Sequence, residues 1–228
     1  RAARYVNLAK QAVANQAAKV PTKVASSVKS SDKVVLLAAS TGGPPAILQL
    51  WQSLPNLLPA PILIVQHMPA GFTEPFAKRI TKAGTVPCVE AKDGMALEPG
   101  VAILAPGGMH MIIDSSQRIR LDDSPTLHGV KPAADFLFES AAKVFGNRIV
   151  AAVLTGMGRD AAAGALHVKK AGGVVYGQNA ETCAVYGMPQ AALDAGAIHA
   201  EWPIGELALV LVKAIEGKRM EGNSNVAA

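Results

Sequence analysis

The chain has 228 residues, 50% of them hydrophobic, which is enough for one sizeable domain whose core needs neither disulfides nor a metal. No apolar run approaches the ~20 residues of a membrane-spanning helix, which excludes insertion into a membrane. Residues 1–33 hold seven of the 22 Lys and Arg and one of the 17 Asp and Glu, so the other residues, with 15 basic and 16 acidic side chains, are nearly neutral. A nucleic-acid-binding domain would carry a basic face on its folded part, which excludes that class too.

The first 32 residues differ from the rest in composition. Residues 1–20 have apolar side chains at helical spacing, and residues 21–32, "PTKVASSVKSSD", have the composition of a linker. The chain begins at Arg1 with no signal segment behind it, so we expect a cytoplasmic protein whose natural N-terminus lies upstream. Cys88 and Cys183 show no paired spacing, and we expect two reduced, buried thiols.

From Lys33 onward the chain alternates short apolar runs with helical patterns. Expected strands are Val34–Ala38, Ile62–Gln66, Val86–Glu90, Ala102–Ala105, Met109–Asp114, Arg118–Leu121, Ile149–Leu154, Gly173–Tyr176 and Ala197–Ala200. Expected helices are Pro44–Leu54, Thr73–Ala83, Ala133–Phe145, Asp160–Ala171, Pro189–Asp194 and Ile204–Glu216. Several strands are continuous Val/Ile/Leu runs, as parallel strands covered on both faces require. The sequence thus predicts an α/β fold with a doubly wound, mostly parallel sheet, and an antiparallel hairpin inserted between about 101 and 122.

Three polar residues follow three of these strands. Ser40 comes after the first, His67 after the second, in "ILIVQHMP", and Asp160 after the seventh, in "VLTGMGRDAAAG". Ligands of open parallel sheets bind at the carboxyl ends of the strands. A serine hydroxyl becomes a nucleophile when an imidazole accepts its proton, and a carboxylate behind the imidazole fixes its tautomer. The positions therefore indicate a Ser-His-Asp triad.

Each of these residues also has a structural interpretation. Ser40 and Asp160 stand where they could cap the helices that follow, and His67 could be a hydrogen-bonded structural residue. The glycine-rich turns at Gly42–Gly43 and "TGMG" favour catalysis, because backbone N–H groups in such turns can stabilise an oxyanion.

Three competing kinds of site fit less well. "ASTGGPP" matches neither GxGxxG nor GxxxxGK[ST], and its prolines lack N–H donors, which argues against a phosphate-binding loop. Ala38 stands where the α/β-hydrolase elbow GxSxG needs glycine. The five histidines lack metal-ligand spacing such as HExxH, so we expect no metal site.

Four segments in order resemble one known family. "AASTGGP", "VQHMPAGFTEPFAKRI", "LTGMGRDAAAG" and "GQNAETCAVYGMPQAAL" are similar to the catalytic domain of the bacterial chemotaxis response-regulator methylesterases, over roughly Lys33 to Ala214. The resemblance implies a three-layer α/β/α fold without a cofactor. It also implies hydrolysis of γ-glutamyl methyl esters on the cytoplasmic helices of methyl-accepting chemotaxis receptors, with release of methanol, and deamidation of receptor glutamines.

Roles for individual residues follow from the same resemblance. It makes Ser40 the nucleophile, His67 the general base and then acid, and Asp160 the orienting carboxylate, with Thr41 and the backbone N–H of Met157 on the oxyanion side. Members of the family usually carry an N-terminal receiver domain that restrains the site. Residues 1–32 would then be an interdomain linker, 33–217 the catalytic domain and 218–228 a flexible tail.

The chain departs from the family pattern at three positions. Ala38 and Ala161 replace common glycines, and Lys131 replaces the usual arginine before proline, which puts any bidentate substrate contact there in doubt. The alternatives to a receptor methylesterase are a catalytically silent receptor-binding module and an esterase acting on small soluble esters.

Overall fold

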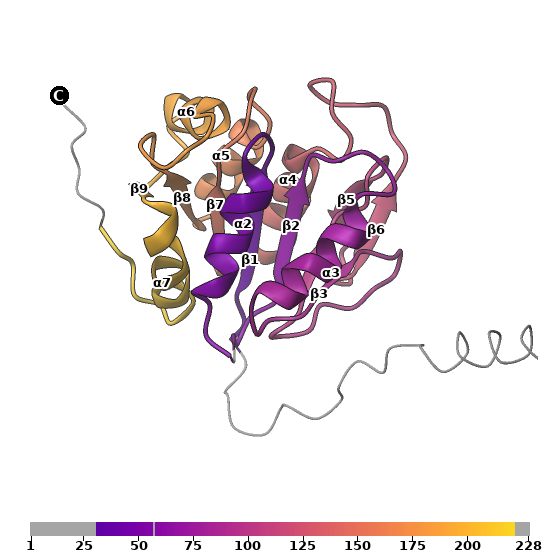
Figure 1. Cartoon of the computed structure of the whole chain (residues 1–228), viewed down its shortest axis with the longest axis horizontal. Coiled ribbons are helices and arrows are strands. Elements are labelled where there is room, and N and C mark those ends of the chain that lie inside the picture. The colour runs from indigo at the N-terminus through magenta and orange to yellow at the C-terminus, as the bar shows by residue number, and fades with distance from the viewer. Residues whose placement is uncertain (1–30, 57, 222–228) are drawn as a thin grey trace, which may run out of the picture.

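The computed structural model of the protein describes residues 31–56 and 58–221 (Figure 1). Seven strands form the main sheet: β1 (Val34–Ala39), β2 (Ile62–Gln66), β3 (Cys88–Glu90), β4 (Ala102–Leu104), β7 (Ile149–Val153), β8 (Val174–Gln178) and β9 (Ala200–Trp202). A separate hairpin consists of β5 (His110–Ile113) and β6 (Ile119–Asp122). The helices are α2 (Gly43–Gln52), α3 (Thr73–Ala83), α4 (Ala134–Phe145), α5 (Ala162–Lys170), α6 (Gly187–Asp194) and α7 (Ile204–Ile215), with a short 3₁₀ turn at Gly146–Arg148.

The main sheet is parallel throughout, in the order β3-β4-β2-β1-β7-β8-β9. The chain leaves β1 toward β2 on one side and later returns to place β7 on the other side of β1. The connections that follow β1 and β7 therefore diverge. The carboxyl ends of these two strands form the topological switch point, where open parallel sheets bind their ligands.

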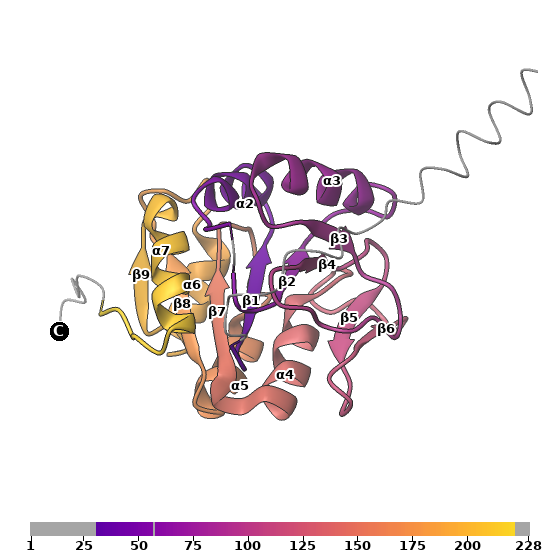
Figure 2. The same ribbon diagram turned by 90° about the horizontal axis from the view of Figure 1, so that it is seen from below.

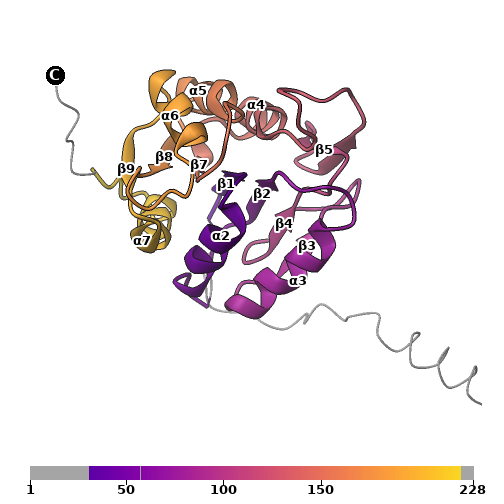
Figure 3. The ribbon, with the colours of Figure 1, turned by 45° about the horizontal axis from the view of Figure 1, so that its top comes forward.

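Helices cover both faces of the sheet. Alternate residues of the uniformly apolar β1 belong to two separate cores: Val35, Leu37 and Ala39 pack with α2, α3 and α7, and Val34, Leu36 and Ala38 pack with α4, α5, α6 and the hairpin. Figure 2 shows α2 and α3 on one side of the strands with α4 and α5 on the other, and Figure 3 shows α6 on the side of α4 and α5. The predicted three-layer α/β/α fold with a mostly parallel sheet is confirmed.

The structure corrects two details of the prediction. The run from 102 to 104 is a strand of the main sheet, so the hairpin comprises only residues 110–122. The last strand begins at Ala200 rather than Ala197, because Gly196 takes a left-handed φ of 70° and Ala197 donates a backbone hydrogen bond to Ala192 O at 3.0 Å, which closes the end of α6.

Some expectations cannot be compared with the structure. The helix at 1–20, all but the last two residues of the linker, and the tail beyond 221 lie outside the described residues. Within the described part, no helix is both long enough and apolar enough to span a bilayer.

Candidate active site

Strand pairing brings the three predicted residues to one edge of the sheet. Ala39 of β1 is paired with Gln66 of β2, so Ser40 and His67 follow neighbouring strands at the same level. The backbone N–H of His67 donates to Ala39 O at 3.1 Å, and that of Ser40 donates to Thr155 O, just after β7, at 3.0 Å. Backbone hydrogen bonds alone thus bring the ends of β1, β2 and β7 together, as expected from the sequence.

His67 and Asp160 are in direct contact. The distance from His67 Nε2 to Asp160 Oδ2 is 2.7 Å, and the two side chains are 10% and 2% exposed. An ionised carboxylate only accepts hydrogen bonds, so Nε2 carries the proton and Nδ1 is the nitrogen left to act as a base. Within residues 31–56 and 58–221 the Ser40 hydroxyl makes no hydrogen bond, neither to His67 nor to another group.

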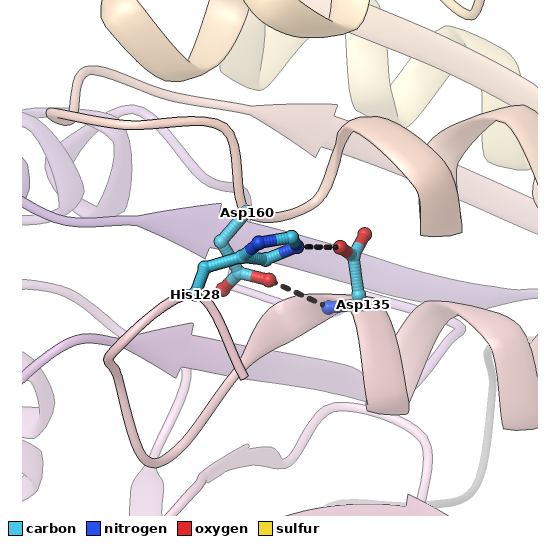
Figure 4. Close-up of side chains that lie close together, drawn as sticks. All are labelled: His128, Asp135 and Asp160. Atoms are coloured by element: carbon cyan, nitrogen blue, oxygen red, sulfur yellow. Dashed lines mark hydrogen bonds and ion pairs between the residues drawn. The ribbon is translucent and has the colours of Figure 1, made fainter. Parts of the chain in front are cut away.

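Asp160 accepts hydrogen bonds from the start of a neighbouring helix. The backbone N–H of Ala134 donates to Oδ2 at 2.6 Å. The backbone N–H of Asp135 donates to Oδ1 at 3.0 Å (Figure 4), so Asp160 caps α4. Burial alone would raise the pKa of Asp160, but the hydrogen bonds from His67, Ala134 and Asp135 outweigh it and hold the pKa below its ordinary value. The carboxylate is therefore kept ionised behind the imidazole.

The interpretation of Asp160 as the cap of its own helix is wrong. The N-cap of α5 is Ala161, with no side-chain cap. The equivalent interpretation of Ser40 also fails, because the N-cap of α2 is Gly42, likewise without a side-chain cap. Gly42 has a φ of 79°, a left-handed conformation that favours glycine, and this turn leads from Ser40 into the helix.

Asp135, at the start of α4, caps the first turn of α5 in the same way. Its Oδ1 accepts the backbone N–H of Gly164 at 2.6 Å, and its Oδ2 lies 3.0 Å from Nε2 of His128 (Figure 4). Burial is the main cause that raises the pKa of Asp135, and the nearby Asp160 adds to it, whereas Gly164 and His128 oppose it. The two helices thus cap each other, and a second His–Asp pair lies beside the predicted one. Neither His128 nor Asp135 was singled out from the sequence.

His128, Asp135 and Asp160 are also the one described group of three potential metal ligands, with ligand atoms within 4.8 Å of one another. Every carboxylate oxygen of the group already accepts a hydrogen bond. The positive ends of two helix dipoles face these carboxylates, which opposes the binding of a cation. The donor set therefore fits a hydrogen-bonded network better than a metal site.

The turn from Ser40 to Gly43 is held by a buried glutamine. Gln66 donates its amide N–H to Ser40 O at 2.9 Å and is 2% exposed. A Cβ on Gly43 would lie 2.0 Å from Gln66 Oε1 and 2.8 Å from the Cβ of Ala39. Glycine at position 43 is therefore required by close packing.

Thr41 and Met157 lie on the two turns that flank Ser40. Neither backbone N–H donates a hydrogen bond to another group in the described part of the chain. The Met157 side chain is 69% exposed, and Thr41 is exposed too. Unpaired N–H groups beside a nucleophile are what an oxyanion site needs.

The three departures from the family pattern have different consequences. Ala38 lies in extended β1, where alanine fits, whereas Ala161 has a φ of 75°, which strains an alanine. Lys131 is 14% exposed and its Nζ lies 2.6 Å from Asp123 Oδ1, so its charge is engaged within the protein.

The two thiols are free, as predicted, but only Cys88 is fully buried; Cys183 is half-buried. Burial raises the pKa of Cys88 to about 12 and that of Cys183 to about 11. Both stay protonated near neutral pH, so neither is an activated nucleophile.

The chain is similar to known proteins over most of its length. The family model described as CheB methylesterase matches residues 35–211. A protein-glutamate methylesterase/protein-glutamine glutaminase of Clostridium acetobutylicum is 43% identical over 192 residues, 83% of this chain and 56% of that protein. The enzyme of the same name from Symbiobacterium thermophilum is 43% identical over 183 residues, 80% of this chain and 51% of that protein.

A solved structure agrees with these relatives. The crystal structure of the Thermotoga maritima CheB methylesterase catalytic domain matches with a TM-score of 0.77 and 36% identity, covering 80% of this chain and 98% of that one. The chain spans about half the length of the curated relatives it matches. The matched family model, the identities and the shared fold together show that the chain belongs to the CheB methylesterase family.

Proposed function

We propose that this protein is a serine hydrolase that removes methyl groups from γ-glutamyl methyl esters of chemotaxis receptors and deamidates receptor glutamines. The observation that carries the proposal is the 2.7 Å contact between His67 and the buried, ionised Asp160, at the strand end next to Ser40. The relatives named protein-glutamate methylesterase/protein-glutamine glutaminase supply the two activities.

The mechanism follows from the orientation of the imidazole. Nδ1 of His67 takes the proton of the Ser40 hydroxyl as its oxygen attacks the ester carbonyl, and Asp160 stabilises the imidazolium through Nε2–H. The N–H groups of Thr41 and Met157 donate to the oxyanion of the tetrahedral intermediate. Nδ1–H then protonates the leaving methoxide, and methanol departs. Water attacks the acyl-enzyme by the same proton transfers, and with a glutamine substrate ammonia leaves in place of methanol.

The proposed partners are the cytoplasmic helices of methyl-accepting receptors and, in the whole protein, a receiver domain that restrains the site. A cytoplasmic location follows from such substrates. The match to only about half of each curated relative leaves room in the whole protein for a second domain.

The test is methanol release from a methyl-esterified receptor cytoplasmic fragment, comparing the chain with its Ser40→Ala variant. Release that disappears in the variant would support both the esterase and its nucleophile. Absence of release from both proteins, with circular dichroism showing intact folds, would favour a binding module or an esterase for other substrates. Equal release from both would mean that another residue is the nucleophile.

A further inference from the structure

Thr155 is a buried polar residue that the mechanism above does not use. It follows β7, two residues before Met157, and is 1% exposed. Its main chain is tied on both sides: the N–H donates to Gln178 Oε1 at 2.9 Å, and the carbonyl accepts the N–H of Ser40 at 3.0 Å. Through its backbone, Thr155 therefore links the turn from Ser40 to Gly43 to the end of β8.

The hydroxyl of Thr155 links two further segments. Oγ1 accepts the backbone N–H of Val185 at 2.9 Å and lies 3.0 Å from Thr41 O and 3.1 Å from Val185 O, to either of which it can donate its single proton. The side chain is also the neighbour of Gly42, where an added Cβ would lie 3.1 Å from Oγ1. One hydroxyl thus contacts the turn after Ser40 and the loop after β8.

That loop lies within the fourth segment of the family resemblance, "GQNAETCAVYGMPQAAL", to which the triad assigns no role. It runs along the turn that carries Met157. Gly156 donates its N–H to Val185 O at 2.9 Å, and Met188 donates to Gly156 O at 2.8 Å. A Cβ on Gly156 would lie 2.8 Å from the Cβ of Ser40, so this turn, the loop and the nucleophile are packed without spare room.

We propose that Thr155 is a positioning residue for the reaction. Its hydroxyl holds the Ser40–Thr41 turn and the Gly156–Met157 turn at the distance and orientation that stabilisation of the oxyanion needs. The inference rests on the proposed function. It assigns to the fourth motif the task of bracing both oxyanion donors through Thr155 and Val185. Displacing such donors by a fraction of an ångström weakens transition-state stabilisation, whereas ground-state binding on the exposed surface is unaffected.

The test compares Thr155→Val, which keeps the shape and removes the hydroxyl, with Thr155→Ser, which keeps the hydroxyl and removes the methyl. Methanol release gives kcat and KM. The rate at which a fluorophosphonate labels Ser40, with loss of fluoride, gives a second readout that needs no receptor. We expect Thr155→Val to lower both kcat and the labelling rate by roughly 10- to 100-fold with KM changed less than about 2-fold, and Thr155→Ser to recover most of each rate.

Thr73→Val is the matched control. Thr73 is also fully buried, and its hydroxyl accepts the N–H of Gly107 at 3.0 Å and donates to Glu90, away from the Ser40 turn. Its loss should lower thermal stability comparably while the labelling rate stays near that of the wild type. Thr155→Ala, assayed at a temperature where it is folded, replaces Thr155→Val if that variant does not fold.

Other outcomes would overturn the proposal. Wild-type rates in all Thr155 variants would show that the hydroxyl positions nothing that the reaction needs. Equal losses in the Val and Ser variants would assign the effect to packing of the whole side chain rather than to the hydroxyl, and a loss in the Ser variant alone would assign it to the methyl group. A loss in Thr73→Val as large as in Thr155→Val would reduce the effect to general stability. A wild-type chain that is labelled at Ser40 yet releases no methanol would instead refute the proposed function and leave the Thr155 comparison intact through labelling.

Discussion

Replacing Asp135 by Asn should shift the acid limb of the kcat/KM profile to lower pH. When ionised, the carboxylate of Asp135, which lies beside Asp160, favours the imidazolium form of His67, the base of the proposed mechanism. Asparagine keeps an oxygen to accept the N–H of Gly164, and its amide can donate to His128 Nε2, so the network stays intact while the charge is lost. We therefore expect the variant to retain activity at more acidic pH than the wild type does.

Coulomb's law sets the size of this shift. Ligand atoms of Asp135 and Asp160 lie within 4.8 Å of each other, and Asp160 Oδ2 lies 2.7 Å from the imidazole. A separation of roughly 8 Å and an effective dielectric constant of about 20 to 40 give about 1 to 2 kcal/mol. One pH unit corresponds to about 1.4 kcal/mol, so we expect a shift of about one unit.

The assay is the rate of methanol release at low substrate concentration between pH 5 and 8, at constant ionic strength. Asp123→Asn is the matched control, because it removes the same charge from a side chain that is 81% exposed, where solvent and salt screen it. We expect the control to move the limb by less than about 0.3 units. An unmoved limb in Asp135→Asn, or equal shifts in both variants, would refute the reasoning.

Three further predictions concern the turns around the site. Asp160→Asn should reduce kcat by about 10⁴, measured by methanol release. Because the pKa of Asp160 lies below its ordinary value, the ionised carboxylate stabilises the wild type, and this stabilisation is lost as pH falls below about 4. The free energy of unfolding should therefore change less with acidic pH in the variant than in the wild type. Ala161→Gly should change the free energy of unfolding by less than about 1 kcal/mol, because relief of the positive φ offsets the lost methyl group and the added entropy of the unfolded chain. Ala38→Gly relieves no strain and should lose about 1.5 to 2 kcal/mol of stability, measured by urea unfolding. Equal losses in the two variants would contradict this reasoning. Gly43→Ala should destabilise the protein by about 1 to 3 kcal/mol and slow methanol release, because the added Cβ displaces Gln66, which holds the turn from Ser40 to Gly43. Wild-type stability and a wild-type rate would exclude this packing argument.

Much of the fold follows from local patterns. Uninterrupted apolar runs such as β1 and β2 identify strands buried on both faces, and the rule that sites form at carboxyl ends then selects Ser40, His67 and Asp160. The least accurate element is β9, where the buried Ala197 belongs to the end of a helix; an apolar residue there has the same pattern whether it continues a strand or closes a turn.

The parts of the site that the sequence did not predict depend on contacts between distant segments. Asp135 reads as an ordinary acidic residue in the first turn of a helix, and its link to Gly164 exists only because α4 and α5 pack side by side. The same holds for Thr155, whose hydroxyl meets Val185 across 30 positions of sequence. No spacing rule reports such contacts. The nitrogen of His67 that faces the carboxylate is likewise set by the packed structure.

The exchange of carboxylates between α4 and α5 has a consequence for local unfolding. The first turn of α4 is completed by Asp160, which lies just before α5, and that of α5 by Asp135 of α4, so opening of either turn disturbs the carboxylate that holds the other. The amide protons of Ala134, Asp135 and Gly164 should therefore exchange with solvent as one cooperative unit. Because Asp160 belongs to that unit, every such opening also removes the support of the imidazole. The native-state exchange of these three amides thus reports how often the proposed catalytic geometry is lost while the rest of the sheet remains folded.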